Sequence, residues 1–152
     1  MSKTVADVMT SEVLTVKKET ALKEAIQILA NKKISALPVV EETGKLVGIL
    51  SEGDLMWQES GVEPPPYIML LDSIIYLQNP AQHDKAIHKA LGQTVGEVMS
   101  DRPLTIKPQQ SVREAARLMH DKKIRRLPVV DEGDCVIGII TQGDIVRMMA
   151  TE

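Results

Sequence analysis

The 152-residue sequence contains no phenylalanine, and aromatic residues make up only 2% of it. A hydrophobic core must therefore be aliphatic, and the 43% of hydrophobic residues can supply one. The single cysteine, Cys135, excludes an internal disulfide bond and fits a reducing compartment. Because Cys135 lies between polar turn residues and the apolar run Val136–Ile140, we interpret it as a packing residue.

The apolar stretches of the sequence are too short to cross a membrane. The longest, Ile68–Leu77, is interrupted by Asp72 and Ser73 and falls well short of the roughly 20 residues that a spanning helix needs. The N-terminal segment MSKTVADVMT has no apolar core of the kind found in signal peptides. We therefore expect a soluble, cytoplasmic protein without a membrane partner.

Residues that carry catalysis or bind nucleic acid are also scarce. The formal net charge of −3 argues against nonspecific nucleic-acid binding, because such binding rests on clustered cations. His83 and His88 are five residues apart and miss the i, i+4 spacing of a helical metal pair. The sequence contains no nucleophile elbow, phosphate-loop lysine motif or Cys/His metal spacing. It thus predicts neither an enzyme nor a metal site, and no catalytic residue.

The main positive feature is an internal repeat. Residues Thr4 to Met56 align with Thr94 to Val146 at a constant offset of 90, and 21 of these 53 positions are identical. One copy of about 50 residues is too small to bury much apolar surface alone, so two copies are expected to share a core. We divide the chain into repeat 1 (1–58), an insert (59–93) and repeat 2 (94–152).

Each repeat predicts a short helix, a strand, a long helix, two strands and a closing helix. The long helices are expected over Thr20–Lys33 and Ser111–Lys123, where apolar residues recur at helical spacing. Brief strands are expected over Val13–Val16 and Leu104–Ile106. Capping boxes, which mark helix starts, are predicted to begin at Thr4, Thr94 and Ser111.

Two strands of each repeat are apolar runs joined by a polar turn. They cover Leu37–Val40 and Leu46–Leu50 in repeat 1, and Leu127–Val130 and Val136–Ile140 in repeat 2. Because β-branched residues predominate, each pair is predicted to form a hairpin. The second strand contains Gly48 or Gly138, and a lone strand glycine often marks a bulge or a close backbone approach.

The insert is predicted to be a helical hairpin of Tyr67–Gln78 and Ala81–Leu91, separated by Asn79 and Pro80. Its apolar side chains must be buried against the repeats or a partner subunit. These side chains are Met69, Leu70, Leu71, Ile74, Ile75 and Leu77.

The junction between the last strand and the closing helix is the most informative local feature. Ser51 or Thr141 is followed two positions later by a Gly-Asp pair that ends at Asp54 or Asp144. Helix capping alone explains this pattern, because hydroxyl N-caps and an acidic third residue favour a helix start. A nucleotide site explains it too. A helix N-terminus with free N–H groups binds anions, and a carboxylate one turn on accepts hydrogen bonds from a ribose diol.

These junctions, together with the strand sequence L-P-V-V, occur twice at the same spacing. In this the sequence resembles the cystathionine-β-synthase (CBS) domain family in its paired form, the Bateman module. The resemblance covers both repeats and implies an α/β (α+β) fold. Two pseudo-symmetric β-α-β-β-α repeats would pack through their sheets.

The resemblance also implies sites for adenosine-containing ligands in the two clefts between the copies. Such a protein is a sensor without chemistry of its own, and it requires no cofactor. Its regulatory ligand would be AMP, ADP, ATP or a relative such as S-adenosylmethionine.

The ligand-binding positions of the family, placed on this sequence, predict two clefts. The first, the Asp144 cleft, combines Thr15, Ile34, Ser35, Ala36, Pro38, Arg125, Arg126, Thr141 and Asp144. The second, the Asp54 cleft, combines Ser51, Asp54, Thr105, Ile124 and Pro128.

We expect the Asp144 cleft to bind its ligand more tightly. Ser35 and Ala36 are small enough to leave room for a flat base. The guanidinium groups of Arg125 and Arg126 offer donors to phosphate oxygens.

Assembly is the last expectation. The resemblance and the apolar insert predict a homodimer, and a regulated target would be a separate protein or an oligomeric state. The alternative to a sensor is an oligomerisation or protein-interaction scaffold, which keeps the fold and ignores nucleotides.

Overall fold

The structure, a computed structural model, describes residues 3–61, 67–70, 73–76 and 80–152; between Gly61 and Lys85 no side chain is described. The chain forms two compact units that do not coincide with the repeats. Unit 1 comprises Met1–Lys17, Pro38–Ile49 and Asp101–Glu152, and unit 2 comprises Lys18–Leu37 and Leu50–Ser100. Each unit therefore contains residues of both repeats.

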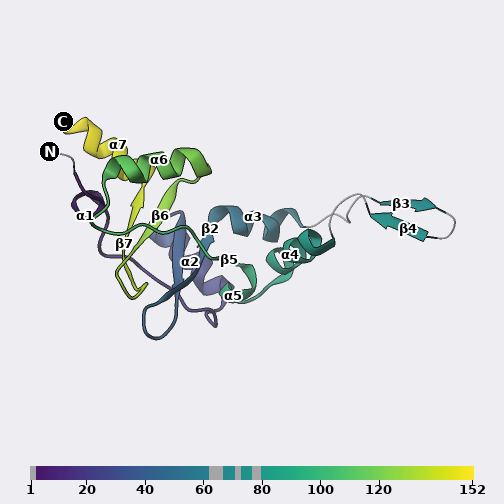
Figure 1. Ribbon diagram of the computed structural model, residues 1–152. Helices are drawn as coiled ribbons and strands as arrows, with labels where there is room; N and C mark the ends of the chain where they lie inside the picture. Colours follow the sequence, from purple (N-terminus) through teal and green to yellow (C-terminus); the bar gives the residue numbers. More distant parts are fainter. Residues whose placement is uncertain (1–2, 62–66, 71–72, 77–79) are drawn as a thin grey trace. The chain divides into compact units, whose positions relative to one another are not determined.

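Apart from the brief strand predicted after each short helix, the elements follow the predicted order in both repeats (Figure 1). Repeat 1 forms α1 (Val5–Val8), α2 (Leu22–Lys32), β1 (Ala36–Val40), β2 (Leu46–Ser51) and α3 (Glu52–Ser60). Repeat 2 forms α5 (Val95–Val98), β5 (Ser100–Asp101), α6 (Val112–Lys122), β6 (Arg126–Val130), β7 (Val136–Thr141) and α7 (Gln142–Ala150). One sheet has the order β1-β2-β5, and β6 pairs with β7 in another. The predicted long helices, hairpins and closing helices are confirmed.

The leading short helix of each repeat packs onto elements of the other repeat. In unit 1, α1 contacts α6 and α7, and Val5 N donates a hydrogen bond to Gln110 O at 2.8 Å. In unit 2, α5 contacts α2, and Val95 N donates to Thr20 O at 2.9 Å. The two bonds are equivalent under the 90-residue offset. This exchange of short helices is one reason why the compact units mix both repeats.

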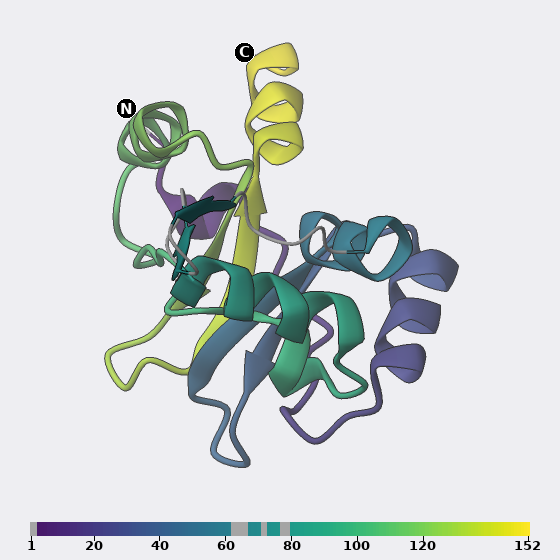
Figure 2. The ribbon, with the colours of Figure 1, turned by 90° about the vertical axis from the view of Figure 1, so that its right-hand side faces the viewer.

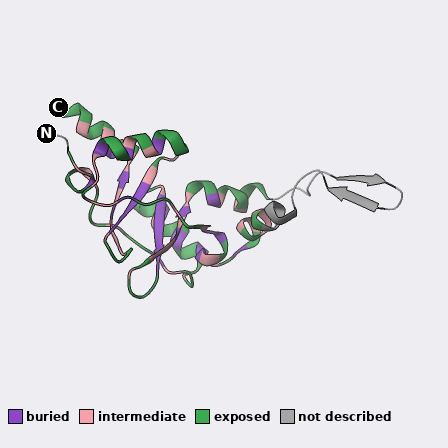
Figure 3. Cartoon of the chain, viewed as in Figure 1, coloured by how far each residue is buried: buried purple, intermediate pink, exposed green. Residues whose placement is uncertain are grey.

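The core of unit 1 is aliphatic, as the composition requires. It is formed by Val5, Ile106, Ala115, Met119, Leu127, Val129 and Ile140. In Figure 3, buried residues run along β6 and β7, whereas the outer side of α6 is exposed. Strands β6 and β7 are antiparallel, with Arg126 opposite Thr141 and a bulge between Val129 and Val130.

Gly138 on β7 permits a close backbone approach, as predicted for this strand glycine. A Cβ at Gly138 would lie 2.5 Å from Met9 Sδ and 3.0 Å from Thr10 O. Thr10 and Ile139 exchange backbone hydrogen bonds of 2.9 Å. A side chain at Gly138 would push the segment after α1 away from β7.

The insert differs from its prediction. Helix α4 (Pro80–Leu91) confirms the second helix, but the first predicted helix, over Tyr67–Gln78, is wrong. Strands β3 (Tyr67–Leu70) and β4 (Ser73–Tyr76) form an antiparallel hairpin instead. Tyrosine and isoleucine prefer extended backbone, and this preference outweighs the apolar spacing that favoured a helix. The burial of the insert's apolar side chains from Met69 to Leu77 lies outside the described residues.

Other details are simpler than expected. The brief strands at Val13–Val16 and Leu104–Ile106 reduce to single parallel bridges, which join Val16 to Val39 and Ile106 to Val129. Capping boxes begin α1 at Thr4 and α5 at Thr94. At Ser111 only half a box forms. Its hydroxyl accepts from Glu114 N at 3.0 Å, while the Glu114 carboxylate accepts from Gln110.

Cys135 is half-buried, and its Sγ lies 3.5 Å from Thr43 O. Among the helices of the described residues, none combines the length and apolar character required to traverse a bilayer.

Candidate functional site

In unit 1, the predicted ligand-binding residues of repeat 2 gather where β7 passes into α7. Arg126 lies opposite Thr141, so their side chains share one face of the hairpin. Gln142 N donates to Arg125 O at 2.9 Å, which places Arg125 beside the first residue of α7. Two guanidinium groups, a hydroxyl and the carboxylate of Asp144 thus come from one end of this hairpin.

Asp144 is buried, with 7% of its surface exposed. Its Oδ2 accepts from Thr141 N at 2.9 Å, and its own N donates to Thr141 Oγ1 at 3.1 Å, which completes a capping box. Its Oδ1 lies 2.5 Å from Nη2 of Arg147, one turn further along α7. The Arg147 side chain is 74% exposed. Capping therefore accounts for one carboxylate oxygen, and a solvent-exposed guanidinium contacts the other.

The N-terminus of each closing helix has fewer free backbone N–H donors for an anion than we predicted. The first amide of α7, Gln142 N, donates to Arg125 O, and the third donates to the cap hydroxyl. In α3 the equivalent first amide, Glu52 N, donates to Ser35 O at 3.0 Å. The expectation of free N–H groups is therefore wrong for the first amide of each helix and the third amide of α7, because the chain itself uses these donors.

Asp54 occupies the equivalent position in unit 2 and is also 7% exposed. Its Oδ2 accepts from Ser51 N at 3.0 Å and from Ser51 Oγ at 3.2 Å. Its Oδ1 accepts from Lys89 Nζ at 2.6 Å and from Ser100 Oγ at 2.8 Å. Both carboxylate oxygens therefore already have hydrogen-bond donors from the protein.

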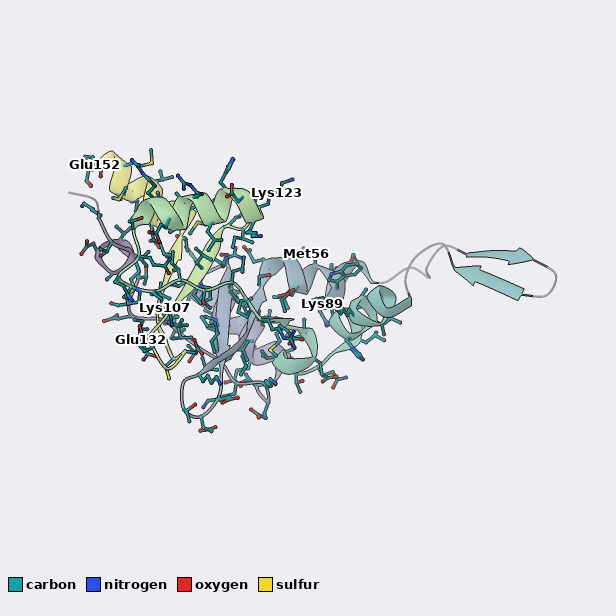
Figure 4. All side chains as sticks on the ribbon, viewed as in Figure 1. Met56, Lys89, Lys107, Lys123, Glu132 and Glu152 are labelled. Atoms are coloured by element: carbon teal, nitrogen blue, oxygen red, sulfur yellow. The ribbon has the colours of Figure 1, made fainter. Side chains whose placement is uncertain are left out.

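Lys89 belongs to α4, the helix of the insert, and lies where α4 faces α3 (Figure 4). Its Nζ also donates to Val98 O at 2.9 Å and to Ser100 Oγ at 3.2 Å. A lysine ammonium has three donors, and these contacts use all of them. The side chains of Lys89 and Asp54 are 20% and 8% exposed. This ion pair is therefore largely shielded from solvent.

Helix α4 is held closely in unit 2, against α3 and α5 (Figure 2). Gln58 on α3 donates its side-chain amide to Lys89 O and, at 3.3 Å, to Gly92 O. A Cβ on Gly92 would lie 2.7 Å from His88 O and 2.8 Å from Val98 Cγ2. The position of Lys89 is thus set by contacts along the C-terminal end of α4.

The remaining predicted residues are distributed over both units. Thr15 and Thr105 are exposed and precede Val16 and Ile106, whose N–H groups donate to the carbonyls of Pro38 and Pro128, each at 3.1 Å. Ile124 packs against the core of unit 1. Ile34, Ser35 and Ala36 belong to unit 2, and they are exposed, half-buried and buried respectively.

Sequence spacing does not reveal Lys89 or Ser100, because they lie 35 and 46 residues beyond Asp54. Arg147 could have been found, since a cation three residues after an aspartate faces it on a helix. Within the part of the chain that the structure describes, no group of three or more His, Cys, Asp or Glu side chains could hold a metal ion.

Two carboxylates in the capping boxes of the short helices have shifted pKa values. Hydrogen bonds from the backbone and hydroxyl of Thr4 lower the pKa of Asp7. A hydrogen bond from the Thr94 hydroxyl, together with backbone donors, lowers the pKa of Glu97. Both residues favour their charged form because the cap donors stabilise it.

The chain contains two tandem repeats, and each has a buried aspartate where its last strand passes into the closing helix. This arrangement identifies a duplicated domain. The CBS domain family matches residues 5–59 and 95–151. The chain therefore belongs to the CBS domain family and contains two CBS domains. This finding, with the structural matches below, confirms the predicted family and α/β fold class.

Known relatives are similar over almost the whole chain. The CBS domain-containing protein CBSX2, chloroplastic, of Arabidopsis thaliana is 36% identical over 150 residues, covering 95% of this chain. The chain spans only 62% of the length of that relative.

Two solved structures carry adenosine compounds. A crystal structure of CBSX2 in complex with AMP matches with a TM-score of 0.84 and 35% identity, covering 98% of this chain and 97% of that one. The CBS domain pair of protein MJ0100 in complex with 5′-methylthioadenosine and S-adenosyl-L-methionine has a TM-score of 0.72 and 26% identity. That match covers 99% of this chain and 98% of the other.

Proposed function

We propose that this chain is a regulatory sensor that binds an adenosine-containing ligand and responds by changing conformation or association. Family membership and the AMP complex of the relative CBSX2 support this function. The observation in this chain that carries it is the cluster at the β7–α7 junction. There Arg126 stands opposite Thr141, and Arg125 and Asp144 flank them.

Each group in this cluster has a role suited to a nucleotide. Arg125 and Arg126 hold phosphate oxygens, because guanidinium donors match their geometry. Asp144 Oδ1 accepts hydrogen bonds from ribose hydroxyls once the exposed Arg147 moves aside. By the family resemblance, Thr15, Ile34, Ser35, Ala36 and Pro38 complete the Asp144 cleft, and Ser51, Thr105, Ile124 and Pro128 line the Asp54 cleft. AMP, ADP and ATP are all candidate ligands.

Calorimetry with AMP tests the role of Asp144. Asp144→Ala is expected to weaken binding by at least about ten-fold, because a hydrogen bond to a charged group contributes roughly 1.5–3 kcal/mol. Asp121→Ala, which removes an exposed carboxylate from α6, serves as the matched control and should bind like wild type. Equal affinities in wild type and Asp144→Ala would reject the assignment.

We further propose that the chain acts as a homodimer and without catalysis of its own. Val146 and Met149 on α7 are 63% and 61% exposed, so this helix presents apolar surface that association would cover. The regulated target is then the oligomeric state or a separate protein in the cytoplasm. Light scattering with and without AMP tests this proposal.

We also propose that the chain divides into repeat 1 (1–58), an insert (59–93) and repeat 2 (94–152).

A scaffold that ignores nucleotides is the second candidate, and the same exposed apolar face of α7 favours it. A thermal-shift experiment separates the two functions. A sensor is stabilised by roughly 2.7 kcal/mol when AMP is present at 100 times its dissociation constant. A scaffold shows no shift with any adenosine compound.

A further inference from the structure

Unit 2 contains a cation positioned where a ligand's sugar would be expected. Asp54 Oδ2 is bound to the helix cap, which leaves Oδ1 as the oxygen that could accept from a ribose. Lys89 Nζ lies 2.6 Å from this oxygen, and Ser100 Oγ lies 2.8 Å from it. A ribose hydroxyl could reach Asp54 Oδ1 only after these two donors had moved.

The contacts of Lys89 indicate a permanent partner of Asp54 rather than a spare cation for a phosphate. All three ammonium donors are used by Asp54, Val98 and Ser100. The side chain is only 20% exposed, so water competes little for the ammonium group. Gln58 and the close packing at Gly92 hold the backbone of this part of α4.

The structure assigns Lys89 as the residue that makes the two pseudo-equivalent sites unequal: seated by α4, it occupies Asp54 and excludes an adenosine ligand there. This inference rests on the proposed function and adds a selectivity residue to it. The insert thereby acts as an internal competitor for one site. At Asp144, by contrast, Oδ1 contacts the side chain of Arg147, which is 74% exposed.

Calorimetric stoichiometry with AMP tests the assignment. Wild type is expected to bind one equivalent per chain, and Lys89→Met is expected to bind two. Lys85→Met is the matched control, because Lys85 is an exposed lysine one turn earlier on α4, and it should stay at one equivalent. In an Asp144→Ala background, Lys89→Met should restore one equivalent, and a further Asp54→Asn change should remove it.

A second variant covers the case in which Lys89→Met fails to fold. Gln58→Ala keeps Lys89 but removes the side-chain contact that ties α3 to the end of α4, and it should also admit a second equivalent at higher AMP concentration. Circular dichroism establishes that each variant is folded.

The outcomes separate the two proposals. One equivalent in wild type and in both folded variants overturns the role of Lys89 and leaves the sensor function standing. Two equivalents in wild type also overturn it. A loss of AMP binding in Lys89→Met alone would make Lys89 a ligand contact instead. No AMP binding by wild type or any variant overturns the sensor function, and the assignment of Lys89 fails with it.

Discussion

Asp54 in unit 2 and Asp144 in unit 1 occupy the same position of two repeats that share 21 of 53 aligned residues. Both are 7% exposed and cap a helix through Oδ2. Their Oδ1 atoms differ, because Lys89 from the insert contacts one and the exposed Arg147 from the same helix contacts the other. Duplication alone would give two equal carboxylates, so the difference between them comes from Lys89 in the insert and from Arg147 in repeat 2.

A difference between the repeats accompanies the two kinds of ion pair. Under the 90-residue offset, Trp57 stands where repeat 2 has Arg147, so α3 carries no cation three residues after its aspartate. A buried carboxylate without a cation or hydrogen-bond donors is strongly unfavourable. The insert supplies both through Lys89 and holds Ser100 beside them. The insert thereby contributes to the stability of unit 2 as well as to its proposed selectivity.

The largest expected effect contrasts the two ion pairs directly. Lys89→Met should destabilise the protein by roughly 3 kcal/mol, because it leaves the buried carboxylate of Asp54 without its cation. Arg147→Met should cost about 0.5 kcal/mol, because solvent already screens the exposed guanidinium. Urea denaturation measures both changes. Equal losses in the two variants would show that burial does not distinguish the pairs.

Alanine substitutions at two glycines, Gly92 and Gly53, are expected to have an intermediate effect on the free energy of unfolding. Gly92→Ala should destabilise by about 2 kcal/mol, because its Cβ would meet the backbone oxygen of His88 at 2.7 Å and displace the end of α4. Gly53→Ala is the matched control on α3, where the nearest atom, Ser51 Oγ, lies 3.7 Å away. It should be neutral or stabilising by up to about 1 kcal/mol, since alanine favours helix. Thermal unfolding of both variants measures the difference, and a harmless Gly92→Ala would show that α4 is not closely held.

The smallest effect concerns pH and the two short helices. The pKa values of Asp7 and Glu97 are lowered in the folded protein, so each charged cap stabilises its helix above the ordinary pKa of its side chain. That contribution is lost as the pH falls through the lowered, folded-state pKa. Carboxyl chemical shifts in an NMR titration should place the midpoint of each residue below the ordinary pKa of its side chain, about 3.9 for aspartate and about 4.3 for glutamate. Asp7→Asn and Glu97→Gln should each remove part of the acid sensitivity, and midpoints at the ordinary values would contradict the capping interactions.

Much of the local structure follows from the sequence alone. Helical periodicity, β-branched runs and N-cap residues place the long helices, both hairpins and the closing helices within a few residues of their observed bounds. These features depend on residues a few positions apart in the sequence, and each feature occurs in both repeats. The position of Asp144 in a cap and its reach to Arg147 belong to the same class of local information.

Only the tertiary structure decided how distant segments combine. The exchange of α1 and α5 between the repeats and the bond from Lys89 to Asp54 have no local signature. The same amphipathic or apolar stretch could pack against several different segments. The observed packing is the one that buries the most surface and leaves the fewest polar groups unpaired. Composition and spacing thus determined two similar halves, and long-range packing made their two aspartates different.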